Sequence, residues 1–108
     1  MEHISTSLVA EIIILAREGQ RGAAEFDALI QRLNEDQQAE LTALMWIGRG
    51  SFEPEELEEA TETARQEAST PTEDYLRGTP HLADHLESAL EALGIDSSEE
   101  EDALYRGG

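Results

Sequence analysis

Hydrophobic residues recur along this chain at spacings of three and four residues, which place them on one face of an α-helix. Glycine and proline interrupt the pattern repeatedly, and each interruption is a signal for a helix end or a helix start. The stretch from Ile12 to Leu15 is β-branched enough for a buried strand, but no second strand-like run exists to pair with it. The sequence therefore predicts an all-α fold, a compact bundle of five to six short helices.

The first predicted helix, from Leu8 to Glu18, is apolar around most of its circumference. Residues Ser5 to Ser7 supply candidate N-caps, and Gly19 supplies a stop signal. A helix that is apolar nearly all round must lie in the centre of a core or be shared with a second copy of the chain. We therefore expect this helix to be buried and to form the interface of a homodimer.

Two further helices follow this first one. An amphipathic helix with one core face is predicted by the apolar positions Phe26, Leu29, Ile30 and Leu33. Asn34 can cap the next helix, and Gln37 three residues later completes a pair that resembles a capping box. This third helix is apolar on two sides, so we expect it to be largely enclosed, with Trp46 as a core anchor.

A fourth helix is predicted from Pro54 to about Ala68, because proline is favoured in the first turn of a helix. One side of this helix carries small residues that allow a neighbouring helix to approach closely. The other side is acidic and should face water. Its glutamates are Glu55, Glu58, Glu59 and Glu62.

Two Thr-Pro pairs each predict an N-cap followed by a proline at the first helical position. Thr70-Pro71 would start a short helix that stops at Gly78, and Thr79-Pro80 a longer helix from Pro80 to Leu93. We expect residues 1–95 to form a single helical domain. Residues 96–108 are rich in serine, aspartate and glutamate, which predicts a disordered acidic tail.

Two segments of the chain resemble the signatures of a known family. Residues 44–50 are Leu-Met-Trp-Ile-Gly-Arg-Gly, and residues 75–87 are Tyr-Leu-Arg-Gly-Thr-Pro-His-Leu-Ala-Asp-His-Leu-Glu. They resemble a bacterial family of small helical proteins, the domain of unknown function 3775, over residues 35–95. The resemblance implies an intracellular helical domain and no catalytic residue. His81 and His85 depart from the family pattern, which is more typically apolar at the first position and aromatic at the second.

The composition excludes several kinds of chemistry. The 108 residues include no cysteine and no lysine, since all seven basic residues are arginine. Disulfides, thiolate nucleophiles, iron–sulfur clusters and lysine Schiff bases are therefore excluded. No nucleophile elbow and no glycine-rich phosphate loop occurs. We expect no enzymatic activity and no cofactor, because the sequence shows neither burial nor a charged partner that would tune a carboxylate for catalysis. An undiscovered enzyme is a further alternative, and it would need a pocket lined by buried polar groups.

The apolar stretches are too short to span a bilayer, and Met1 to His3 lack the basic start of a signal peptide. We therefore expect a cytoplasmic protein that does not bind membranes. Direct nucleic-acid binding is also disfavoured, since the formal net charge is −18 and phosphate contact needs a basic surface.

The negative charge is unevenly distributed along the chain. Residues 1–52 hold eight acidic residues against four arginines, a net −4, whereas residues 53–108 hold seventeen against three, a net −14. Three interpretations remain open: adaptation to solubility or high salt, docking of a basic partner, and mimicry of a nucleic-acid backbone. The uneven distribution favours docking. We therefore predict a non-enzymatic interaction or regulatory module whose Glu55, Glu58, Glu59 and Glu62 bind a protein with a basic surface.

A metal-binding protein is the alternative prediction. His81, Asp84 and His85 are spaced so that, on one helix, two imidazoles and a carboxylate would lie on one strip. Such a strip is a known arrangement for Zn²⁺ or Ni²⁺. An ordinary solvated helix face would have the same residues, and the pattern by itself does not separate the two.

Overall fold

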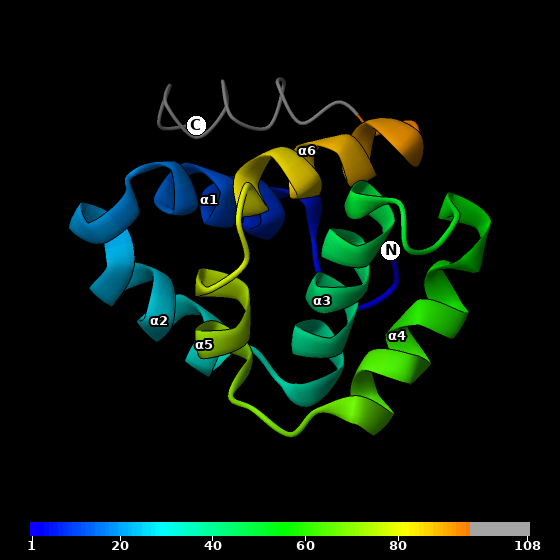
Figure 1. Cartoon of the computed structure of the whole chain (residues 1–108), viewed down its shortest axis with the longest axis horizontal. Coiled ribbons are helices and arrows are strands. Elements are labelled where there is room, and N and C mark those ends of the chain that lie inside the picture. Colours follow the sequence, from blue (N-terminus) through cyan, green and yellow to red (C-terminus); the bar gives the residue numbers. More distant parts are fainter. Residues whose placement is uncertain (96–108) are drawn as a thin grey trace.

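The computed structural model describes residues 1–95, which contain six α-helices and no strand (Figure 1). The predicted all-α fold is confirmed, whereas the predicted acidic tail, residues 96–108, lies outside the described residues. Short 3₁₀ turns at Gly19–Gly22 and Pro54–Glu56 precede the second and fourth helices. The helices are α1 (Thr6–Arg17), α2 (Ala23–Arg32), α3 (Glu35–Arg49), α4 (Leu57–Glu67), α5 (Thr72–Arg77) and α6 (Leu82–Ala92).

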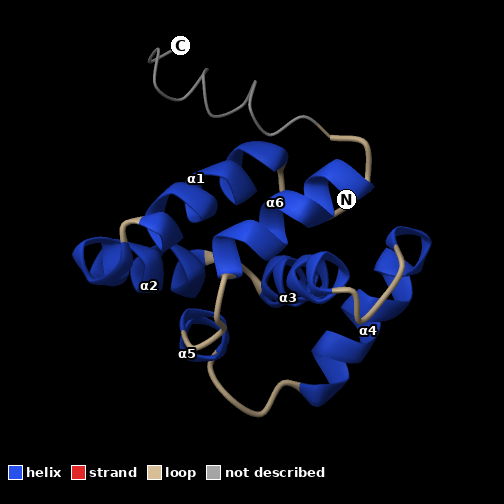
Figure 2. Cartoon of the chain, turned by 45° about the horizontal axis from the view of Figure 1, so that its top comes forward, coloured by secondary structure: helices blue, strands red, loops and turns tan. Residues whose placement is uncertain are grey.

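Helix α3 is the centre of the bundle. It packs against α6, α4 and α5, and Figure 2 shows α4 on one side of it and α5 on the other. Every residue of α3 from Ala39 to Met45 is buried. The predicted capping box is confirmed at its start, where the Asn34 Oδ1 accepts from the Gln37 amide at 2.8 Å and the Gln37 Oε1 accepts from the Asn34 amide at 2.9 Å.

Helix α1 is buried, as its apolar circumference predicted. Val9, Ile12 and Ile13 are fully buried, and Ser5 is the N-cap, with its hydroxyl accepting from the Leu8 amide at 3.2 Å. The residues that cover α1 come from α6 and α2 of the same chain. The homodimer stays a prediction, but α1 is buried within one chain, so its apolar circumference no longer requires a second copy. Within residues 1–95, no helix is both long and apolar enough to cross a membrane.

Helices α3 and α6 cross so closely at Gly48 that the crossing point has no room for a side chain. A β-carbon added at Gly48 would lie 1.7 Å from the backbone carbonyl oxygen of His85 on α6. Leucines of both helices, including Leu44 and Leu86, are fully buried in the core. A backbone-to-backbone approach of this kind requires glycine, because any other residue would force the two helices apart.

The starts of the two Thr-Pro helices were predicted wrongly. Helix α5 begins at Thr72 with Pro71 as its N-cap, and α6 begins at Leu82 rather than at Pro80. His81 interrupts the expected helix, because its backbone has a left-handed conformation with φ 59°. The hydroxyl of Thr79 donates to the Tyr75 carbonyl at 2.9 Å, so it does not cap α6.

Replacing Gly48 by alanine tests the crossing. We expect G48A to lower the free energy of unfolding by about 3 kcal/mol or more, because its β-carbon meets backbone that cannot move without separating α3 from α6. Gly78→Ala is the matched control, since a β-carbon there meets its nearest neighbour at 3.4 Å. Denaturant unfolding measures both variants, and an equal effect of the two substitutions would contradict the close crossing.

Candidate functional site

A hollow on the surface brings the N-terminal segment and the first half of α4 together. Its volume is about 780 Å³, and seven glutamates line it against a single arginine. We call it the acidic hollow. It is lined by Met1, Glu2, His3, Glu40, Glu55, Glu56, Leu57, Glu58, Glu59, Thr61, Glu62 and Arg65. All four glutamates that the sequence singled out for partner binding are therefore in this one place.

These four glutamates are exposed, as expected for the acidic side of the fourth helix. Glu62 forms an ion pair with Arg65 on the next turn of α4. Within residues 1–95, no basic side chain forms an ion pair with Glu55, Glu58 or Glu59. Three carboxylates of the acidic hollow thus remain without a counter-charge from the described part of the chain.

A buried carboxylate forms part of the wall of the acidic hollow. Glu40 has only 3% of its surface exposed, and it accepts three backbone hydrogen bonds from the N-terminal segment. The donors are the amides of Glu2 at 3.1 Å, His3 at 3.0 Å and Ile4 at 2.8 Å. Three donors compensate the cost of burying the charge. Glu40 therefore holds the N-terminal segment against α3, and this contact shapes one side of the hollow.

The sequence analysis missed Glu40. Its one signal was a glutamate in the middle of the apolar stretch of α3, where a charge has to find partners. The partners themselves were not visible, because they lie 36 to 38 residues away along the chain.

Arg65 lies at the edge of the acidic hollow and is engaged on two sides. Its guanidinium donates to the Asp36 Oδ1 at 2.7 Å, and it pairs with Glu62. The hydrogen bond to Asp36 raises the pKa of Arg65 above its usual value. Arg65 therefore stays charged, and its charge is already used within the chain.

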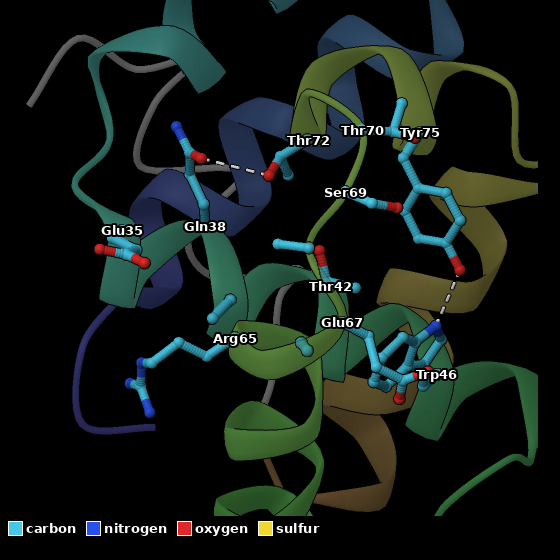
Figure 3. Close-up of a pocket in the computed structure, with 13 residues that line it drawn as sticks. Glu35, Gln38, Thr42, Trp46, Arg65, Glu67, Ser69, Thr70, Thr72 and Tyr75 are labelled. Atoms are coloured by element: carbon cyan, nitrogen blue, oxygen red, sulfur yellow. Dashed lines mark hydrogen bonds between the residues drawn. The ribbon is translucent and has the colours of Figure 1, made fainter.

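A second cavity, of about 280 Å³, lies between α3, the end of α4 and the segment that leads into α5 (Figure 3). We call it the Trp46 pocket. It is lined by Glu35, Gln38, Ala39, Thr42, Trp46, Ala64, Arg65, Glu67, Ala68, Ser69, Thr70, Thr72 and Tyr75. Arg65 contributes to the linings of both the Trp46 pocket and the acidic hollow.

Two aromatic side chains form one end of the Trp46 pocket. The indole Nε1 of Trp46 donates to the Tyr75 hydroxyl at 3.0 Å, and the Trp46 ring stacks on Phe52 with 5.7 Å between ring centroids. Trp46 packs against the core as predicted, but it is only half-buried because part of it faces the pocket. Tyr75, with 38% of its surface exposed, is the one large hydrophobic residue that the described chain leaves exposed. The sequence analysis did not identify this pocket.

The three candidate metal ligands lie near one another, but His81 is the residue before α6 and not part of the helix on which all three were expected. His81 lies before α6 in a left-handed conformation, and its Nδ1 is 3.9 Å from the Asp84 Oδ2. The rings of His81 and His85 are 6.5 Å apart between centroids, and Asp84 also lies 3.8 Å from Arg17. Within residues 1–95, no group of three or more histidine, aspartate or glutamate side chains is arranged to hold a metal ion.

Glu40→Gln tests the role of the buried carboxylate. We expect the free energy of unfolding to fall by about 1–3 kcal/mol, because the amide lacks the charge and one of the two acceptor oxygens. Hydrogen exchange of the Ile4 amide should become faster at the same time. Glu11→Gln, an exposed position on α1, should change stability by less than about 0.5 kcal/mol. Unchanged Ile4 exchange in the Glu40 variant would contradict this role.

Comparison with known proteins agrees with the resemblance seen in the sequence. Residues 23–95 match the model of a family described as "Protein of unknown function (DUF3775)". Searches of curated proteins and of solved structures found no match. The family match extends from the start of α2 beyond the end of α6 and contains the Trp46 pocket and the glutamates of α4. Because this match covers more than half of the 108 residues, the chain belongs to the DUF3775 family of proteins of unknown function.

Proposed function

We propose that this protein is a non-enzymatic interaction module, which binds a protein partner by receiving a basic segment of that partner in the acidic hollow. One observation carries the proposal. Glu55, Glu58 and Glu59 are exposed, line one hollow and lack an ion-pair partner within residues 1–95. A basic segment would supply the missing counter-charges.

The strength of such an interface comes from several weak charge interactions that act on the same ligand. A single exposed ion pair contributes only about 0–1 kcal/mol, so no one glutamate is sufficient. In the acidic hollow several carboxylates act on the same ligand, and a concave wall of low dielectric strengthens their combined field. The interaction should therefore weaken as added salt screens the charges.

The acidic hollow is also held in shape before any partner arrives. Glu40 fixes the N-terminal segment through three hydrogen bonds, and Ala60 and Thr61 anchor the inner side of α4 in buried positions. Pre-formed walls lower the entropy that a partner must lose on binding. A glutamate cluster on an unstructured segment would lack this advantage.

A matched pair of variants separates docking from general acidity. The docking set replaces Glu55, Glu58, Glu59 and Glu62 by glutamine. The scattered set replaces Glu11, Glu18, Glu25 and Glu91 by glutamine, and all four of these residues are exposed and lie outside the acidic hollow. Both sets change the net charge equally. The probe is a fluorescent ten-residue peptide of alternating arginine and serine, and its anisotropy measures binding at low and physiological salt.

We expect the docking set to weaken binding of this peptide about fivefold to tenfold, since three exposed pairs at about 0.3–0.5 kcal/mol each, those of Glu55, Glu58 and Glu59, amount to that factor. The scattered set should weaken it by less than about twofold, and added salt should weaken the wild type. Equal losses in both sets would show that only the net charge matters and would contradict the proposal. Thermal unfolding of each variant verifies that the compared proteins are folded.

A further inference from the structure

Thr42 is a buried polar residue whose hydroxyl has no hydrogen-bond partner within residues 1–95. Only 7% of its surface is exposed. The hydroxyls of Thr61, Thr63 and Thr79 each donate to the carbonyl four residues earlier, at 2.8 to 2.9 Å. Thr42 makes no such bond. The Thr42 oxygen is not among the fully buried atoms that lack a partner, so it is the accessible part of an otherwise buried residue.

Thr42 lies on the wall of the Trp46 pocket. Gln38, Thr42 and Trp46 are four residues apart on α3, which places them in one row facing the cavity (Figure 3). The outer two have partners across the pocket: Gln38 accepts from the Thr72 hydroxyl at 3.2 Å, and Trp46 donates to Tyr75. The middle member of the row is the one without a partner. A polar atom of a ligand would fill that position.

The rest of the lining combines apolar and charged residues with the hydroxyls of Ser69 and Thr70. Ala39, Ala64 and Ala68 contribute small apolar surfaces, and the aromatic pair closes one end. Glu35 and Glu67 also line the pocket, and neither forms an ion pair within residues 1–95. The one cation of the lining, Arg65, is held by Asp36 and Glu62.

These features together select the charge and shape of a ligand. Free carboxylates and aromatic rings favour a cation, since rings attract positive charge to their faces. Alanine surfaces accommodate an aliphatic stem. A volume of about 280 Å³ is close to the lower end of small-molecule sites and suits a ligand of the size of one long side chain.

We propose that the Trp46 pocket binds a guanidinium or ammonium group on an unbranched aliphatic stem, with the Thr42 hydroxyl oxygen accepting a hydrogen bond from one of its N–H groups. The group comes either from an arginine or lysine side chain of a bound protein or from a free amine. This site shares only Arg65 with the lining of the acidic hollow, and the proposal does not depend on the function of that hollow.

The fluorescence of Trp46 reports directly on this site, because Trp46 is the single tryptophan of the chain. The probes are N-acetyl-arginine amide, which represents a protein side chain, and agmatine, which represents a free amine. N-acetyl-citrulline amide is the control, since it has nearly the same shape without the charge. We expect a saturable change with a Kd on the order of 1 mM for a charged probe and at least about tenfold weaker binding of the citrulline compound.

Thr42→Val removes the unpaired hydroxyl at nearly constant shape. We expect it to weaken binding of the charged probe about threefold to tenfold without lowering the unfolding temperature, because no hydrogen bond within the protein is lost. Thr61→Val is the matched control: Thr61 is also a buried threonine, but its hydroxyl bonds the Leu57 carbonyl and it does not line the Trp46 pocket. This control should bind the probe like the wild type.

The fluorescence responses to the two charged probes test the proposal and identify the source of the ligand. A response to the blocked arginine alone assigns the site to a protein side chain, a response to agmatine alone assigns it to a free amine, and either one supports the proposal. The absence of a saturable response to both probes would overturn it. Equal binding of the citrulline compound, or unchanged affinity in Thr42→Val, would also overturn it.

Discussion

The close crossing of α3 and α6 at Gly48 is the constraint on which the rest of this structure depends. With no side chain at that point, the backbones of the two helices meet and the central helix is fixed in the bundle. The other faces of α3 are then available to α4, α5 and the N-terminal segment. Both candidate sites are built on this one helix, with Glu40 in the wall of the acidic hollow and Thr42 in that of the Trp46 pocket.

Glu40 and Thr42 are two residues apart on α3 and illustrate two uses of a buried polar group. The Glu40 carboxylate accepts hydrogen bonds from three backbone amides, and these bonds hold the N-terminal segment against α3. Thr42 has no partner within the described residues and faces a cavity, so its hydroxyl is available to a ligand. The acidic residues differ in the same way: Asp36 and Glu62 are paired with Arg65, whereas Glu58 and Glu59 of α4 form no ion pair within residues 1–95.

The sequence was informative wherever the determining contacts are local. Helical periodicity predicted the buried α1 and the amphipathic α2, and the Asn34 and Gln37 pair predicted the start of α3. The start of α6 was mispredicted because a left-handed backbone at His81 leaves no signal in helical periodicity. The roles of Glu40 and of the Trp46 pocket could not be read from periodicity, because their contacts join residues 36 and 29 positions apart. Such contacts depend on the packing of the whole bundle.

Docking of a basic segment in the acidic hollow can be followed by an NMR titration of the isotopically labelled protein with the arginine–serine peptide, because backbone amide shifts locate a ligand residue by residue. We expect saturable shifts at the amides of Glu55 to Glu62 and of residues 2–4, whose amides are bound to Glu40. Shifts spread evenly over acidic positions of all six helices, or concentrated on α1 and α2, would contradict docking in the hollow.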